Sequence, residues 1–139
     1  RQRQMCIRDR RYDNAMVLNN YAYFLSLEGR DLERALAMAG RAIVLEENNP
    51  TYLDTYAWVL YRLGRYDEAK KTMQQALSLD RSQSPDLQLH YGDILAALGE
   101  KFMAEVYWKK ALEGGYDDPD AIVERFRRLK EAAQTPAAP

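Results

Sequence analysis

The chain has 139 residues, a length that suits one domain of ordinary size, and 47% of them are hydrophobic, which is enough to bury a core. Its 20 Lys and Arg residues nearly balance its 21 Asp and Glu residues, so no strong net charge favours nucleic acid or an anionic membrane as a partner. Cys6 is the single cysteine, which excludes an internal disulfide and a zinc site built from cysteines.

The N-terminal residues differ in pattern from the rest of the chain. Residues 1–12 are predicted to be an irregular segment, either native or foreign to the protein, because "RQRQMCIRDR" is basic and lacks apolar periodicity. The chain starts with Arg1 rather than Met, which predicts a fragment of a longer protein. A signal peptide or lipid-attachment site would lie upstream, so the compartment stays open between cytoplasmic, periplasmic and part of a lipid-anchored protein. No apolar run approaches the roughly 20 residues that span a bilayer, so a soluble domain without direct membrane insertion is expected.

Residues 13–118 contain three similar stretches when the sequence is compared with itself at a shift of about 35 residues. "NNYAYFLSLEGRDLERA" aligns with "DTYAWVLYRLGRYDEA" and with "LHYGDILAALGEKFMA". A small residue, a glycine and two alanines recur in each stretch. The recurring positions are Ala22, Ala57 and Gly92; Gly29, Gly64 and Gly99; Ala35, Ala69 and Ala104; and Ala42, Ala76 and Ala111.

Each stretch is predicted to form two amphipathic helices joined by a glycine turn, at about 14–48, 50–80 and 85–115. In the second stretch, one helical face holds Leu53, Tyr56, Ala57, Leu60 and Leu63. Gly64 then supplies the left-handed conformation that ends a helix. The small side chains of Ala57 and Ala69 allow the two helix axes to approach closely. Pro50 and Pro85 fit the first turns of the opening helices.

A capping helix is expected over residues 119–133, followed by a disordered tail over residues 134–139. Its apolar face contains Ile122, Val123, Phe126 and Leu129. A basic cluster of Arg125, Arg127, Arg128 and Lys130 lies elsewhere on this helix, and is either a solvated face or a site for an acidic partner.

These residues make the chain resemble the tetratricopeptide repeats, which are helical hairpins of about 34 residues. The wording of the first two stretches further resembles the carboxy-terminal repeats of bacterial tetratricopeptide proteins. The resemblance implies an all-α fold, a right-handed superhelical solenoid of three helix-turn-helix repeats with a C-terminal capping helix. Lys101 replaces the turn aromatic of the third repeat, with Phe102 beside it. The best match is the second stretch, through Leu53, Tyr56, Ala57, Leu60, Gly64, Tyr66, Ala69 and Ala76.

No constellation of residues predicts catalysis, a cofactor or a metal ion. His90 is the sole histidine and lies far from Cys6 in sequence, which argues against a nucleophile pair. A metal site of His90 with Asp54 and Asp93 would lack a second histidine, so a packed histidine is favoured. Asp117, Asp118 and Asp120 suit a helix start better than a calcium loop. We therefore expect a protein that is not an enzyme.

The resemblance implies that the opening helices line a concave groove. Asp54, Trp58 and Tyr61 follow i, i+4, i+7 spacing and therefore share one stripe. Trp58 either contacts a partner there or fills space between neighbouring helices. The predicted groove comprises Asn19, Tyr23, Asp54, Trp58, Tyr61, Arg62, Leu89 and Asp93.

Some members of the family grip a chaperone's terminal carboxylate with lysine, asparagine and arginine side chains. The corresponding places here hold Asn19, Tyr23, Thr55, Asp86 and His90, of which only one clearly matches. The resemblance therefore implies a protein or peptide partner that is neutral or basic rather than an acidic chaperone tail.

The sequence predicts a protein-interaction module. The alternatives are self-association through an exposed end bearing Met16, Val17 and Leu18, which would give a homodimer, or a structural arm of a larger protein.

Overall fold

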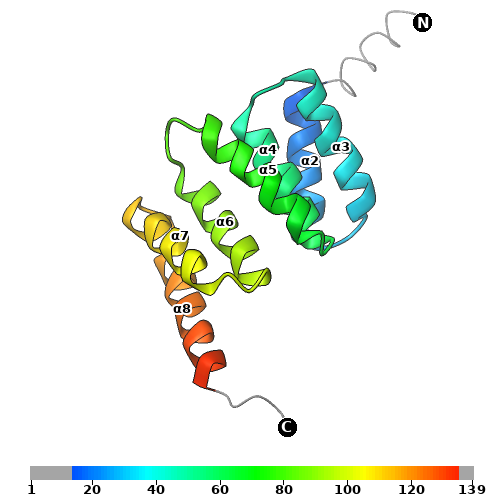
Figure 1. Ribbon diagram of the computed structural model, residues 1–139. Helices are drawn as coiled ribbons and strands as arrows, with labels where there is room; N and C mark the ends of the chain where they lie inside the picture. Colours follow the sequence, from blue (N-terminus) through cyan, green and yellow to red (C-terminus); the bar gives the residue numbers. More distant parts are fainter. Residues whose placement is uncertain (1–13, 135–139) are drawn as a thin grey trace, which may run out of the picture. The chain divides into compact units, whose positions relative to one another are not determined.

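The computed structural model describes residues 14–134, which form seven helices and, within that range, no strand (Figure 1). This confirms the all-α class that the sequence predicts. The residues divide into two compact units, one ending at Arg81 and the other starting at Ser82. The predicted irregular segment at 1–12 and residues 135–139 of the predicted tail lie outside the described residues, whereas Gln134 ends a helix. The first unit contains α2 (Ala15–Glu28), α3 (Leu32–Leu45), α4 (Pro50–Arg62) and α5 (Tyr66–Leu79).

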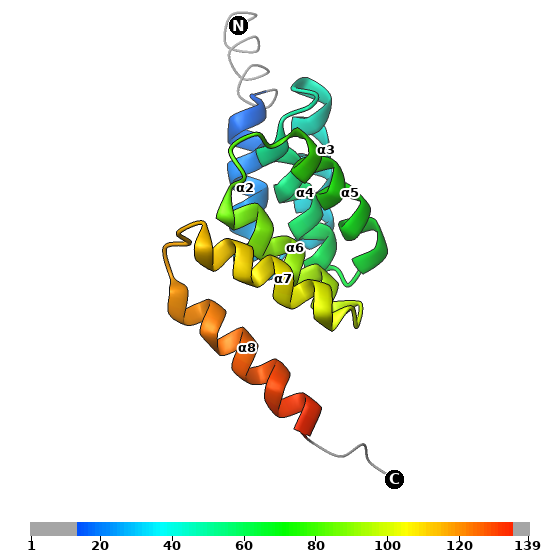
Figure 2. The same cartoon turned by 60° about the vertical axis from the view of Figure 1, so that its left-hand side comes forward.

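The second unit contains three further helices (Figure 2). They are α6 (Pro85–Ala97), α7 (Lys101–Glu113) and α8 (Pro119–Gln134). Contacts are densest between consecutive helices of each hairpin, α2 with α3, α4 with α5, and α6 with α7. Within the first unit α4 also contacts α2 and α3, and within the second α8 contacts α7.

Helices α2 and α4 each begin after an asparagine whose side chain satisfies free backbone N–H groups. The Asn14 side chain accepts a hydrogen bond from the Val17 N–H at 3.1 Å, which caps α2. The Asn49 side chain accepts from the N–H groups of Thr51 and Tyr52 at 3.0 and 3.3 Å, which caps α4. Pro50 and Pro85 occupy first-turn positions of α4 and α6, as the sequence predicts, because no intrahelical partner is lost there.

The hairpin turns share one hydrogen-bonding pattern. At the end of α4, Gly64 has φ +80° and donates its N–H to the Tyr61 carbonyl at 3.0 Å, while the Arg65 N–H reaches the Leu60 carbonyl at 2.9 Å. This is the Schellman arrangement, which needs a left-handed residue after the helix. The left-handed role predicted for Gly64 is therefore confirmed. Gly29 and Gly99 adopt the same conformation at φ +69° and +81° after α2 and α6.

Small side chains fill the interior of the hairpins. The Ala57 and Ala69 side chains are fully buried, which permits the close helix approach inferred from the sequence. Tyr52, at the start of α4, packs with Ala15, Leu18 and Ala42 and so joins the second hairpin to the first. The central cluster of the first unit consists of Ala22, Leu25, Ala35, Ala39 and Val59.

Trp108 is buried in the second unit, and the absence of a side chain at Gly92 makes room for it. A Cβ placed on Gly92 would lie 2.4 Å from Trp108 Cδ1, far inside van der Waals contact. Only 4% of the Trp108 side chain is exposed. Phe102, which sits beside the lysine that replaces the turn aromatic, is 76% exposed and stays out of the hairpin core.

Candidate functional site

The residues of the predicted groove are distributed over both units. Leu89 and Asp93 belong to α6 of the second unit. The other six lie on two helices of the first unit that contact each other, α2 and α4, and we call them the α2–α4 surface. The α2–α4 surface consists of Asn19, Tyr23, Asp54, Trp58, Tyr61 and Arg62.

A row of three aromatic rings runs along α4 to the start of α5. The Trp58 and Tyr61 rings stack with centroids 4.7 Å apart and planes 17° from parallel. Tyr61 also contacts Tyr66, the first residue of α5, at a centroid distance of 5.5 Å. All three side chains are half-buried. Because each ring supports the next, the row presents apolar area whose rotamers are already fixed.

The polar residues of the α2–α4 surface are more deeply buried than the sequence indicates. Asp54 is 8% exposed and Asn19 is 5% exposed. The Asn19 Nδ2 donates to Asn20 Oδ1 at 3.3 Å, whereas Asn19 Oδ1 is buried and accepts no hydrogen bond from the described residues. A buried acceptor without a donor typically costs about 1–3 kcal/mol. Because Asn19 Oδ1 is itself buried, it belongs to the interior of the first unit and is not a contact point for a ligand.

Tyr23 and Arg62 complete the α2–α4 surface. Tyr23 is half-buried, and its backbone carbonyl accepts a hydrogen bond from the buried Ser26 hydroxyl at 2.5 Å. Arg62 is exposed and reaches the turn between α2 and α3, since a Cβ placed on Gly29 would lie 2.8 Å from its Nη2 atom. Arg62 therefore stands at one end of α2 and adds a positive charge near the aromatic row.

Leu89 and Asp93, unlike the other predicted groove residues, lie on α6 within the second unit. Leu89 is 2% exposed. Asp93 is 8% exposed, and its Oδ1 accepts hydrogen bonds from Trp108 Nε1 at 2.9 Å and Arg125 Nε at 2.7 Å. Arg125 Nη2 donates to the other carboxylate oxygen at 2.9 Å. Both Asp93 oxygens are thus engaged within the second unit, a pairing over 32 positions that sequence spacing did not indicate.

The basic cluster of α8 is largely neutralised along the helix. Arg127 pairs with Glu124 and Glu131, and Arg128 Nε lies 3.1 Å from Glu124 Oε1. Hydrogen bonds from Arg127, and then from Arg128, lower the pKa of Glu124 to about 2. Exposed pairs at i, i+3 and i, i+4 are typical of a solvated helix face. The structure therefore favours the solvated face over a site for an acidic partner.

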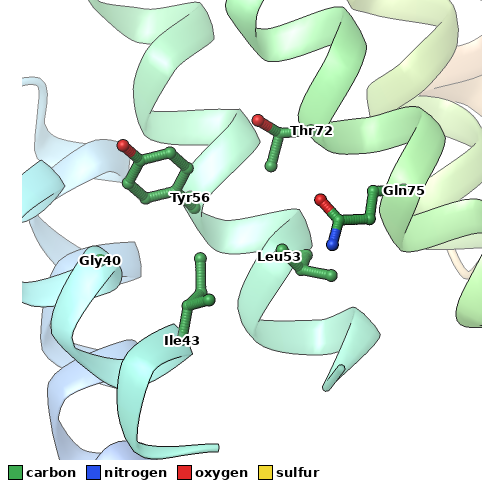
Figure 3. A pocket seen from close by; sticks show the side chains of 6 residues that line it. All are labelled: Gly40, Ile43, Leu53, Tyr56, Thr72 and Gln75. Carbon is green, nitrogen blue, oxygen red and sulfur yellow. The ribbon is translucent and has the colours of Figure 1, made fainter. Parts of the chain in front are cut away.

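One pocket in the first unit was not predicted from the sequence. It has a volume of about 280 Å³ and lies between α3, α4 and α5 (Figure 3). Gly40 in the interior of α3 is the signal that could have revealed it, because glycine is unfavourable inside a helix and here leaves space beside the Tyr56 ring, 3.4 Å from where a Cβ would lie. The pocket is lined by Gly40, Ile43, Leu53, Tyr56, Thr72 and Gln75.

Within residues 14–134, neither a cluster of metal-ligating side chains nor a membrane-spanning helix is present. Among these residues, no group of three His, Cys, Asp or Glu side chains is placed to hold a metal ion. None of the helices from α2 to α8 is long and apolar enough to cross a membrane.

Comparison with known proteins agrees with the helical hairpins. A family model described as tetratricopeptide repeat matches residues 50–82, which contain α4 and α5. A TPR repeat-containing protein of Pseudomonas aeruginosa is 31% identical over 81 residues, or 58% of this chain. Residues 50–82 are therefore a tetratricopeptide repeat. The chain spans only 13% of the length of that Pseudomonas relative.

Solved structures share the fold of this chain. The type III secretion translocator chaperone SycD of Yersinia enterocolitica has a TM-score of 0.72 and 19% identity, covering 88% of this chain and 96% of SycD. The first TPR of Spaghetti (RPAP3), bound to the HSP90 peptide SRMEEVD, has a TM-score of 0.73 and 19% identity, covering 87% and 94% of the two chains. These similarities confirm the helical-repeat solenoid class that the sequence predicts.

Proposed function

We propose that this protein is a non-enzymatic interaction module whose α2–α4 surface binds a peptide or a segment of a partner protein. The row of half-buried aromatic rings formed by Trp58, Tyr61 and Tyr66 is the observation that carries the proposal. The rings of Trp58 and Tyr61 would supply the apolar contact with the peptide. Rigid aromatic side chains of this kind dominate the binding energy of many interfaces. The RPAP3 domain, which is bound to an HSP90 peptide, supports a peptide as the ligand class.

The residues at the clamp positions of the first unit favour a neutral or basic ligand over an acidic tail. The RPAP3 peptide, SRMEEVD, ends in acidic residues. The clamp positions of this chain hold Asn19, Tyr23 and Thr55 in the first unit, and the Thr55 hydroxyl donates to the Thr51 carbonyl. No lysine or arginine stands at those three positions, whereas Asp54 adds a buried carboxylate. An acidic tail would therefore find no cation to pair with at these three clamp positions.

A peptide selection tests this proposal. We expect peptides selected from a displayed random library against the intact protein to be neutral or basic. Their affinity should fall about tenfold or more in Trp58→Ala and in Asp54→Lys, measured by fluorescence anisotropy, because each change removes a contact at the centre of the surface. Phe102→Ala, which removes an exposed aromatic from the second unit, serves as the matched control. Selected peptides that bind both variants as tightly as the wild type would refute this site.

Self-association is a second candidate, supported by the outer face of α2. Met16, Val17, Tyr21, Phe24 and Leu27 are 40–59% exposed, and Glu28 is the one charged residue of this helix. Apolar and aromatic residues without charges are typical of interface cores. Leu18 was expected on this face, but it is buried and packs with Ala15, Ala42 and Tyr52. The SycD structure, described as an alternative dimer, adds support for a dimer.

Light scattering across a concentration series tests this second candidate. We expect the mass of the wild type to rise towards that of a dimer, because association would remove the α2 side chains from water. Phe24→Asp should remain monomeric, whereas Phe102→Asp, an equally polar change at another exposed phenylalanine, should associate like the wild type. A wild-type mass that stays monomeric over the whole series would rule out the candidate.

A structural arm of a longer protein is a third proposal, consistent with the small share of the Pseudomonas relative that the chain spans.

A further inference from the structure

The second unit contains a buried carboxylate whose partners come from two different helices. Asp93 on α6 accepts a hydrogen bond from the Trp108 indole of α7 and a two-pronged pair from the Arg125 guanidinium of α8. A carboxylate that is 8% exposed depends on such partners, because an uncompensated buried charge is strongly unfavourable. The indole belongs to the α6–α7 hairpin itself, so α8 contributes to this carboxylate through Arg125.

Few side chains attach α8 to the rest of the unit. Ile122 is the only buried residue within the Pro119–Gln134 helix. Phe126 meets the Trp108 ring edge-on at 5.6 Å, and Arg125 also donates to the Ala121 carbonyl at 3.0 Å. Ile122, Arg125 and Phe126 follow i, i+3, i+4 spacing, and Leu129 at i+7 is half-buried, so the attachment lies within about two helical turns. Val123, Arg127 and Arg128 on the same helix are exposed.

The α6–α7 hairpin is completed without α8. Gly115 has φ +86°, and its N–H reaches the Leu112 carbonyl at 3.2 Å, while the Tyr116 N–H reaches the Ala111 carbonyl at 3.1 Å. These bonds end α7 in the same Schellman arrangement as the hairpin turns. Residues between Tyr116 and Pro119 then lead into α8. Detaching α8 would therefore leave the hydrogen bonds of α7 and its C-terminal turn intact.

We propose that the α6–α7 hairpin is a receptor site for an arginine-bearing amphipathic helix, which α8 occupies in this chain and leaves by local opening. The site offers the Asp93 carboxylate to a guanidinium and the Trp108 ring to an aromatic side chain one position further on. The ligand class is a helix with an aliphatic residue, an arginine three positions later and an aromatic residue next to it, the order of Ile122, Arg125 and Phe126. An incoming helix of this class competes with α8, so its apparent affinity equals its intrinsic affinity multiplied by the fraction of molecules in which α8 is detached.

Amide hydrogen exchange of the full chain tests the local opening. We expect α8 amides to exchange faster than those of α6 and α7 in the wild type, and about tenfold faster again in Arg125→Gln, with α6 and α7 little changed. Arg128→Gln removes the same charge from an exposed position of α8 and should leave the pattern near wild type. Arg125→Lys keeps the charge but not the two-pronged geometry. Its α8 exchange rate should therefore fall between those of the wild type and Arg125→Gln. Equal protection of all three helices in the wild type, or α8 unaffected by Arg125→Gln, would overturn the local opening.

A synthetic peptide with the sequence of residues 118–134 tests the receptor site in trans. We expect it to shift the Trp108 indole N–H resonance of full-length Arg125→Gln at concentrations about tenfold lower than those needed with the wild type. The same peptide carrying Arg125→Gln should not produce the shift. If the two peptides behave alike, or if neither affects the Trp108 resonance of either protein, the receptor site is disproved.

Discussion

Gly92 allows a close contact between two helices of the second unit because it has no side chain. It lies on α6 opposite Trp108, whose indole occupies the volume that a side chain at position 92 would need. The same indole donates to Asp93, the next residue along α6. The sequence indicated that a small residue recurs at this place, but it did not indicate that a tryptophan fills the space. The glycine is therefore required by a tertiary contact rather than by its backbone conformation.

We predict that Gly92→Ala destabilises the protein by about 1–3 kcal/mol, because the added methyl overlaps the Trp108 ring and forces it or α6 to move. Urea unfolding followed by far-UV circular dichroism measures the loss. Ala97→Ser adds one heavy atom at an exposed position of the same helix and serves as the control. A Gly92→Ala variant as stable as this control would show that the ring accommodates the methyl without cost.

At the scale of the element, α8 combines charges paired along its own length with one arginine that reaches another helix. Glu124 pairs with Arg127 and Arg128, and its pKa of about 2 lies well below its ordinary value of 4.5. Sequence spacing left two alternatives for the basic residues of this helix, and the contacts favour the solvated face. The predicted cluster also included Arg125, whereas the structure separates Arg125 from its neighbours by engaging it with Asp93. Helical position alone cannot show which arginine meets a carboxylate on another helix.

The lowered pKa of Glu124 predicts a pH dependence for α8. A carboxyl with a depressed folded pKa contributes stability above its unfolded value, and that contribution is lost as pH falls through the folded value. We therefore expect Glu124→Gln to reduce the stability of α8 at pH 7, with the difference from wild type shrinking between about pH 4.5 and pH 2. Amide exchange of α8 across this range is the measurement. A wild-type advantage that is unchanged near pH 2 would contradict the assignment.

At the scale of the whole molecule, each of the two units carries its own tryptophan, Trp58 in the first and Trp108 in the second. Repeat proteins are stabilised by terms within each repeat and between neighbours, so a local change need not weaken every part equally. The indole N–H resonances of the two residues therefore report on the two units separately. This gives a direct measurement of how far the units share one unfolding transition.

We predict that Ala69→Leu, an enlargement at a fully buried position of α5, lowers the unfolding midpoint reported by Trp58 more than that reported by Trp108. Overpacking of this size costs about 1–3 kcal/mol. The midpoints come from the two indole resonances during a urea titration. Lys71→Leu, at an exposed position of the same helix, should change neither by a comparable amount. Equal shifts of both midpoints would show that the chain unfolds as one cooperative unit.

Short-range rules made much of this protein predictable from its sequence. The repeat period, the helix pairs and the left-handed glycine at position 64 depend on apolar spacing and on the steric freedom of a residue without Cβ, both of which act over a few residues. The tertiary structure decided what depends on distant residues. It buried Leu18, left Phe102 exposed, joined Tyr66 to the aromatic row and engaged Asp93 with Arg125. Such outcomes are set by which helices meet and how deeply each side chain is buried, and a one-dimensional pattern does not contain that information.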